Sequence, residues 1–291
     1  MYVTVLLSNP AAPALSQSTV ESLCDAWAGR DLRWLSEGEA AEFAMDRVPD
    51  VRWQVWDDLQ AMGIDMAVVP ADGRRKRMLL ADMDSTMIDQ ECIDELAEVA
   101  GIGDRVKDIT ARAMDGQLDF EGALTERVAL LAGLDAGVID AVYRDRITLA
   151  SGGATLLATI TASGGHGALV SGGFTAFTTK VAADLGFHEH RANRLKIADG
   201  KLTGDVDRPI LGREAKVTAL TEITARLGIS PEAVIAVGDG ANDLGMLHAA
   251  GLGVALHAKP SVAAQCDVRI NHGDLTALLY LQGYPKAAFK S

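Results

Sequence analysis

The stretch that decides the fold is MLLADMDSTMIDQE, residues 78–91. An apolar run ends there in Asp82 and Asp84, which are separated by one residue, and Ser-Thr follows at once. Like charges held this close repel each other, and beside apolar residues they also lose hydration. The pair is therefore either a solvated turn or helix cap, or it surrounds a cation. Two ionised carboxylates in an oxygen-rich site suit Mg²⁺, so the second interpretation predicts a magnesium site.

Downstream of this stretch, strand patterns alternate with helical ones, which is typical of a parallel sheet in an α/β fold. The predicted strands are 78–82, 167–170, 233–237, 252–256 and 267–270. The predicted helices are 174–185, 212–227, 242–250 and 274–282. Residues 86–150 carry only helical patterns and are interpreted as an insertion after the first strand. Residues 188–206 predict a short hairpin that turns at Asp199-Gly200.

The N-terminal part of the chain, residues 1–74, predicts a separate small α+β domain. Its predicted strands are 2–7 and 64–70, with a weak one around 32–36, and its predicted helices are 15–28 and 49–63. The polar, charged segment 71–77 is typical of a domain boundary. We therefore expect a second domain over 75–291.

Composition limits the classes of function. Of 291 residues, 48% are apolar, which allows a sizeable core and excludes a disordered chain. A net charge of −13 without basic runs disfavours nucleic acid and anionic membranes as partners. The chain has three cysteines and no CxxC pair, which fits a reduced cytosol. We find no signal-peptide pattern and no membrane-spanning apolar run, so we expect a cytoplasmic protein.

Two further features carry chemistry only in combination. Ser171, Gly172 and Gly173 directly follow a predicted strand and offer a hydroxyl and backbone N–H groups, which suit a phosphate. An ordinary glycine-rich turn is the alternative, and the motif alone favours it. Lys216 lies inside a predicted helix, where most lysines are on the surface. Only its place among the other motifs makes it a candidate.

The last motif is VGDGANDLGML, residues 237–247. Its glycines permit a tight turn that brings Asp239 to a ligand at the end of a predicted strand. Asp243 falls in the first helical turn, where a carboxylate also suits the helix dipole. A capped helix is the alternative, and the earlier DMDST motif in the same chain weakens it.

In chain order, Asp82–Thr86, Ser171, Lys216 and Asp239–Asp243 resemble the four motifs of the haloacid dehalogenase (HAD) superfamily of phosphatases. The resemblance covers about 78–285. It implies a Rossmann-like core with a parallel sheet and a helical cap insertion at about 86–150. The first motif, the cap segment MDGQLDFEGALTERVALLAGL and the stretch ANRLKIADGKLTG are similar to the phosphoserine phosphatase family. Met83, where many members carry Phe, is a departure that we expect to be neutral.

This resemblance implies a phosphoric monoester hydrolase that converts O-phospho-L-serine to L-serine and phosphate, the last step of serine biosynthesis. Asp82 is implied as the nucleophile, giving an aspartyl-phosphate, and Asp84 as general acid and then base. The implied Mg²⁺ ligands are the Asp82 carboxylate, the Asp84 backbone carbonyl and Asp239, with Asp243 orienting the metal shell. The implied phosphoryl-binding residues are Ser171, Gly172, Gly173 and Lys216.

The resemblance also assigns the amino-acid end of the substrate. Glu91 is implied to meet the ammonium and Arg127 the carboxylate, while Met114 and Phe120 form an apolar cap wall and Asn242 lies near the substrate. A solvated helix face for Arg127, core packing for Met114 and Phe120, and helix capping for Asn242 are the alternatives. Another phosphomonoester, such as phosphohomoserine or a sugar phosphate, is the competing substrate class. Transfer of the phosphoryl group to an alcohol also stays open.

The N-terminal domain loosely resembles an amino-acid-binding ACT-type module. That resemblance implies a regulatory role with L-serine as the ligand, or a role in forming a homodimer. A binding or sensing function for the whole chain is the alternative class, and it is disfavoured because every catalytic position of the phosphatase motifs is occupied.

Overall fold

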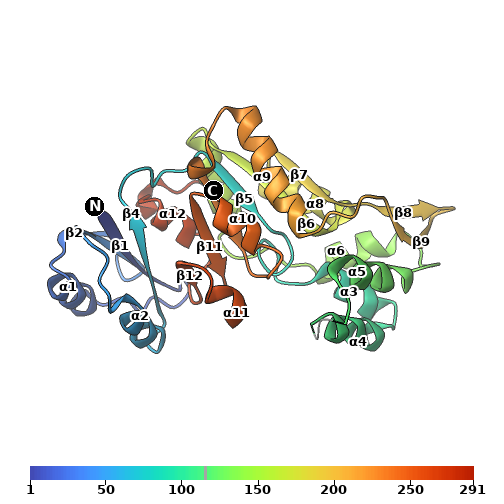
Figure 1. Cartoon of the computed structure of the whole chain (residues 1–291), viewed down its shortest axis with the longest axis horizontal. Helices are drawn as coiled ribbons and strands as arrows, with labels where there is room; N and C mark the ends of the chain where they lie inside the picture. The colour runs from blue at the N-terminus through green and yellow to red at the C-terminus, as the bar shows by residue number, and fades with distance from the viewer. Residues whose placement is uncertain (115–116) are drawn as a thin grey trace.

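The main element of the structure, a computed structural model that describes residues 1–114 and 117–291, is a six-stranded parallel sheet (Figure 1). Its order is β12-β11-β10-β5-β6-β7. The strands are β5 Met78–Ala81, β6 His166–Phe174, β7 Glu189–Asn193, β10 Val234–Gly238, β11 Leu252–Leu256 and β12 Val268–Ile270. All five strands predicted after residue 75 are present, which confirms the predicted α/β fold.

Helices cover both faces of this sheet, as near-continuous apolar strands require. Successive residues of β5 alternate between two apolar clusters, with Leu79 and Ala81 in one and Met78 and Leu80 in the other. The first cluster is completed by α7 Gly153–Ala162, α8 Thr175–Leu185 and α12 Ala277–Leu281. The second is completed by α9 Arg213–Leu227, α10 Leu244–Ala249 and α11 Pro260–Ala263. Short 3-10 turns lie at Pro231–Ala233 and Lys286–Ala288.

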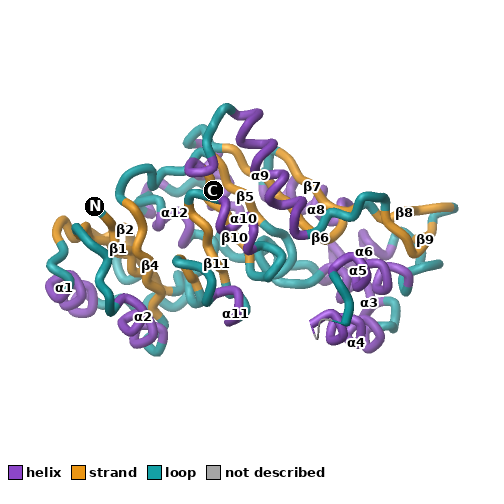
Figure 2. The backbone as a smooth tube through the Cα atoms, viewed as in Figure 1, coloured by secondary structure: helices purple, strands orange, loops and turns teal. Residues whose placement is uncertain are grey.

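Four helices between β5 and β6 form the structure that we call the cap. They are α3 Cys92–Val99, α4 Gly103–Met114, α5 Phe120–Ala129 and α6 Val138–Arg146. Figure 2 shows them gathered at the end of the molecule opposite to the N-terminal strands. Asp119 starts α5 by accepting a hydrogen bond from the Gly122 N–H, 2.7 Å away, which is a typical helix N-cap.

The segment predicted as one hairpin, residues 188–206, is divided between two sheets. Residues 189–193 form β7, the edge strand of the main sheet, so the predicted hairpin was wrong for this part. The hairpin itself is β8 Leu195–Ala198 and β9 Lys201–Val206, and it turns at Asp199-Gly200 as predicted. Strand β7 was not recognised because its sequence, EHRAN, is mostly polar, as an edge strand that is only partly buried allows. The hairpin packs on the cap, where Gly133 N–H donates to the Leu202 carbonyl.

The N-terminal segment forms a four-stranded antiparallel sheet in the order β2-β3-β1-β4. Its elements are β1 Tyr2–Ser8, α1 Gln17–Ala26, β2 Arg30–Ser36, β3 Ala40–Met45, α2 Arg52–Gln60 and β4 Ile64–Pro70. The order β-α-β-β-α-β is that of ferredoxin-like units. Strand β3 was missed because its sequence, AAEFAM, contains three alanines and little β-branched character.

This antiparallel sheet is joined firmly to the rest of the chain. One of its faces packs on α1 and α2, and the other face, with Val3 and Val5, belongs to the same apolar cluster as α12. Asp65 on β4 is fully buried and accepts three backbone hydrogen bonds, from Asn271, His272 and Gly273, at 2.8–2.9 Å. Three N–H donors on one carboxylate make this contact a fixed joint.

Candidate active site

The candidate site lies where three neighbouring strands of the main sheet end. Asp82 directly follows β5, Ser171 lies in the last part of β6, and Asp239 directly follows β10. Because these strands are parallel and adjacent, their carboxyl ends bring the three residues to one edge of the sheet. All three line a single cavity of about 350 Å³, which lies between the sheet and the cap.

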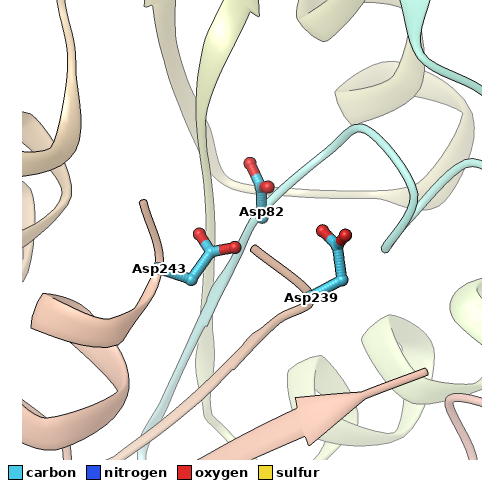
Figure 3. A group of neighbouring side chains, drawn as sticks. All are labelled: Asp82, Asp239 and Asp243. Carbon is cyan, nitrogen blue, oxygen red and sulfur yellow. The ribbon is translucent and has the colours of Figure 1, made fainter. Parts of the chain in front are cut away.

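Three carboxylates form the floor of this cavity, with Asp82 and Asp239 lining it and Asp243 buried beneath them. Oxygens of Asp82, Asp239 and Asp243 all lie within 4.8 Å of one another. Figure 3 shows Asp82 at the end of β5, with Asp239 and Asp243 on either side of it. Carboxylate oxygens at this spacing are the donor set of a hard divalent cation, so these residues fit a metal ion.

Lys216 balances part of this negative charge. It is only 1% exposed, and its Nζ lies 2.6 Å from Asp82 Oδ1 and 2.5 Å from Asp243 Oδ1. Burial by itself would lower the pKa of Lys216, but the two carboxylates outweigh it and the pKa is raised. Lys216 is therefore a buried ammonium within the floor, not a surface lysine of α9.

The second aspartate of the DMDST motif has a different environment. Asp84 Oδ1 accepts a hydrogen bond from the Cys92 N–H at 2.8 Å, and Oδ2 accepts one from Ser171 Oγ at 3.3 Å. Burial, helped by the nearby Glu91 carboxylate, raises the pKa of Asp84 to about 6. Burial also raises the pKa of Asp82, while the Lys216 ammonium acts against that rise. The Lys216 ammonium therefore favours the charged form of Asp82, whereas the Glu91 carboxylate favours the neutral form of Asp84.

The two glycines after Ser171 are required by close contacts. A Cβ on Gly173 would lie 2.7 Å from Asp84 Oδ2, and a Cβ on Gly172 would lie 2.9 Å from the Phe120 ring. Gly173 N–H donates to Ser171 Oγ at 2.8 Å, which fixes the turn of the backbone. Larger residues would push the second aspartate or the cap away from the cavity.

Burial also raises the pKa of Asp239, to about 7, with Asp243 as the second cause. Asp243 accepts from Lys216 on one oxygen and from the Gly240 N–H, at 2.9 Å, on the other. Both oxygens of Asp243 are therefore occupied by protein groups. Among the three clustered carboxylates, Asp82 and Asp239 keep oxygens that are better placed to bind a cation.

The cap supplies the opposite wall of the cavity. Glu91, Phe120 and Arg127 line it, together with Asn242 from the loop after β10. Ser85 Oγ donates to Glu91 Oε1 at 2.9 Å, and Arg127 Nε donates to the Ala123 carbonyl at 3.3 Å. Met114 ends α4, and its side chain lies outside the described part of the structure.

Sequence analysis missed several residues that line the cavity, among them Asp94 and Thr110 on the cap wall and Lys259 in the loop after β11. Asp94 on α3 follows Glu91, the N-cap residue of that helix, by three positions, so helical spacing could have placed both on one face. Thr110 and Lys259 belong to no phosphatase motif, and their place in the cavity depends on how distant segments pack.

Comparisons with known proteins agree with this arrangement. The family model described as haloacid dehalogenase-like hydrolase matches residues 79–248. A phosphoserine phosphatase of Streptomyces coelicolor is 44% identical over 84% of this chain, and the match covers 60% of that protein. A phosphoserine phosphatase of a Polaromonas species is 47% identical over 70% of this chain and 89% of its own length.

A solved structure of a HAD family hydrolase from Salmonella enterica serovar Typhi matches 97% of this chain and 98% of its own, with a TM-score of 0.87 and 31% identity. The likeness therefore extends over the N-terminal sheet as well as the main one. Within the described residues, no helix has the length and apolar character needed to cross a membrane. The chain belongs to the haloacid dehalogenase-like hydrolase family, and its relatives of 44% and 47% identity in that family are phosphoserine phosphatases.

Proposed function

We propose that this chain hydrolyses O-phospho-L-serine to L-serine and phosphate, as the last step of serine biosynthesis, in the cytoplasm. One observation carries the proposal. The carboxylate and lysine floor faces, across a single cavity, a cap wall that holds both an acidic and a basic side chain, Glu91 and Arg127. Such a cavity suits a small phosphomonoester whose other end carries an ammonium and a carboxylate.

At the phosphoryl end, the free oxygen of Asp82 attacks phosphorus and the bond from phosphorus to the serine oxygen breaks, leaving an aspartyl-phosphate on Asp82. Asp84, with its pKa raised to about 6, gives a proton to the departing serine oxygen. Asp84 then takes a proton from the water that attacks phosphorus, the bond from phosphorus to the Asp82 oxygen breaks, and phosphate is released. The same carboxyl therefore acts first as acid and then as base.

Two sets of groups stabilise charge during these steps. Ser171, Gly172, Gly173 and Lys216 are donors for the phosphoryl oxygens. The metal that we propose is Mg²⁺, held by the carboxylates of Asp82 and Asp239 and the backbone carbonyl of Asp84, and it would offset the repulsion between Asp82 and the phosphate dianion. Asp243 orients this arrangement through Lys216 and the Gly240 N–H.

At the amino-acid end, Glu91 accepts from the substrate ammonium and Arg127 donates to its carboxylate. The position of Arg127 supports this role, because its side chain is partly buried in the cavity wall and no ion pair is formed by it within the described residues. Phe120 and Met114 are proposed as the apolar part of this wall, and Asn242 as a neighbour of the substrate.

We further propose that residues 1–74 are an ACT-like domain, with residues 75–291 as the phosphatase domain and the cap at about 86–150. The β-α-β-β-α-β order supports this, and L-serine binding or homodimer formation is its proposed role. Removing 1–74 would expose the apolar sheet face that packs on α12, so Asp65→Asn is the milder test. If the subunit association of Asp65→Asn and its inhibition by L-serine match those of the wild type, the contact made by Asp65 has no role in regulation.

The test of the main proposal is phosphate release from a panel of phosphomonoesters, with Mg²⁺ and with EDTA. We expect L-phosphoserine to give the highest kcat/KM and EDTA to stop turnover, with Mg²⁺ restoring it. A sugar phosphate or phosphohomoserine that wins by a wide margin would overturn the substrate assignment and leave the floor chemistry intact. Undiminished turnover in EDTA would overturn the metal assignment.

A further inference from the structure

One polar group in the cavity wall has no role in the reaction described above. Thr110 on α4 lines the cavity, and its hydroxyl oxygen is buried without a hydrogen-bond partner among the residues that the structure describes. A helical threonine usually donates to the carbonyl four residues earlier, which here is that of Val106, and no such bond is present. A buried, unpaired hydroxyl destabilises a protein, so a hydrogen-bond partner supplied by a ligand would remove this free-energy penalty.

The surroundings of Thr110 indicate the charge of that partner. Residues from three cap helices line the cavity, and the polar ones are Glu91, Asp94, Thr110 and Arg127. Two of these are carboxylates, which are sufficient acceptors for one ammonium. Among the described cap residues that line the cavity, Arg127 is the one cation, and Lys259 lines the cavity from the loop after β11. A substrate carboxylate has about four lone-pair sites to fill. A second donor of the cap wall beside Arg127 would therefore have a lone pair to fill.

Thr110 and Arg127 lie on neighbouring helices. Helix α4 packs beside α5, and the ion pair of Arg112 Nη1 with Glu126 Oε2 at 2.8 Å ties them together, two residues after Thr110 and one residue before Arg127. Arg127 uses Nε for the Ala123 carbonyl, which leaves its terminal nitrogens for a ligand. Both residues therefore line the same wall of the cavity, on helices that contact each other.

We propose that Thr110 is a substrate-binding residue: rotation about its Cα–Cβ bond turns the buried hydroxyl toward the cavity that the residue lines, where it donates a hydrogen bond to the α-carboxylate of the substrate, beside Arg127. This inference rests on the proposed function and adds a specificity-determining residue to it. The phosphate is not the partner, because its donors Ser171 and Lys216 belong to the floor, whereas Thr110 belongs to the opposite wall.

The test compares two substrates that differ in the carboxylate, L-phosphoserine and O-phosphoethanolamine. Thr110→Val removes the hydroxyl at nearly constant volume, and Thr110→Ser keeps it. Thr125→Val is the matched control, because Thr125 also lies on the cap but its hydroxyl meets Arg208 at 3.4 Å and does not line the cavity. Kinetics and the thermal midpoint of the ligand-free protein are measured for each variant.

We expect Thr110→Val to lower kcat/KM for L-phosphoserine by about 10- to 100-fold, mainly through KM, since the lost hydrogen bond is to a charged group. Turnover of O-phosphoethanolamine should stay at the wild-type level, and so should both substrates with Thr110→Ser and Thr125→Val. The thermal midpoint of Thr110→Val should be unchanged or raised, because the variant no longer buries an unpaired hydroxyl.

Other results would overturn the inference. Equal losses on both substrates, or a Thr110→Ser variant as impaired as Thr110→Val, would show that Thr110 acts through packing. If Thr110→Val has unchanged kinetics while the wild type prefers L-phosphoserine, Thr110 does not bind the substrate, and the proposed function is unaffected. A wild-type enzyme that does not prefer L-phosphoserine to O-phosphoethanolamine would overturn the proposed function itself.

Discussion

The floor and the cap wall of one cavity have opposite characters. On the floor, Asp82, Lys216 and Asp243 are almost fully buried and already bonded to one another. On the cap wall, Glu91 is exposed, Arg127 has no ion pair among the described residues, and Thr110 has no partner there. Groups that perform the same chemistry on every ester can be paired in advance, whereas groups that select one ester keep their bonds for it.

This comparison predicts that a floor variant loses the same share of its activity on every substrate. Asp82→Asn removes the attacking oxygen anion, so we expect kcat to fall by at least on the order of 10⁴-fold for every phosphomonoester. Phosphate release under saturating substrate measures this. A variant that lost activity on L-phosphoserine alone would mean that Asp82 selects substrates, and the division between floor and wall would fail.

The next largest effect is expected for Lys216→Met, which should reduce both turnover and stability. Loss of one preorganised donor lowers kcat by about 10²- to 10³-fold. Two buried carboxylates also lose their cation, which costs about 3–5 kcal/mol of unfolding free energy. Urea unfolding is the measurement, and Lys180→Met is the matched control, because Lys180 forms an exposed pair with Asp140. Equal losses in the two variants would contradict a paired floor.

A third prediction uses the raised pKa of Asp84. The carboxyl has a pKa of about 6 in the folded chain and 3.8 as a free group, so it favours folding only below about pH 4 and loses that contribution as the pH rises through about 6. Asp84→Asn has no such titration. We expect the free energy of unfolding of the variant, relative to that of the wild type, to rise by about 3 kcal/mol between pH 4 and pH 7.5.

Thermal unfolding in EDTA at several pH values measures this gain. Asp199→Asn, an exposed hairpin position, serves as the control and should show no change with pH. A gain that is equal at pH 4 and pH 7.5 would mean that burial of the Asp84 charge is not the cause. The opposite sign would mean that the folded chain stabilises the ionised form.

The floor is the part of the molecule that the sequence predicts best. Asp82, Ser171 and Asp239 each follow an apolar run, and parallel strands bring such positions to one edge of the sheet. The same local logic predicts five of the six strands of the main sheet, all but β7. Each of these signals is complete within about ten residues of chain, so no knowledge of packing is needed.

The parts that sequence analysis missed depend on partners far away in the chain. Strand β3 is defined by its pairing with β1 and β2, and its alanines carry no strand preference of their own. The joint at Asp65 joins residues about 206 positions apart. Thr110 is unexceptional in sequence, and only the absence of a carbonyl partner within the described residues singles it out.

The smallest of the predicted effects concerns the cap wall and is the sharpest test of the comparison. Arg127→Ala should raise KM for L-phosphoserine by about 10- to 100-fold, because a charge-assisted pair with the substrate carboxylate is lost. The KM for p-nitrophenyl phosphate, which has no carboxylate, should change little. Arg112→Ala is the matched control on the cap, since Arg112 pairs with Glu126 away from this cavity.

Equal rises in KM for both esters would mean that Arg127 shapes the cap and does not select the substrate. The size of the selective loss also distinguishes two arrangements of the wall. If Arg127 and Thr110 hold the same carboxylate, the double variant Arg127→Ala with Thr110→Val should lose less than the product of the two single losses, because the second donor has little to bind once the first no longer positions the anion. Losses that multiply fully would place the two side chains on different groups of the substrate.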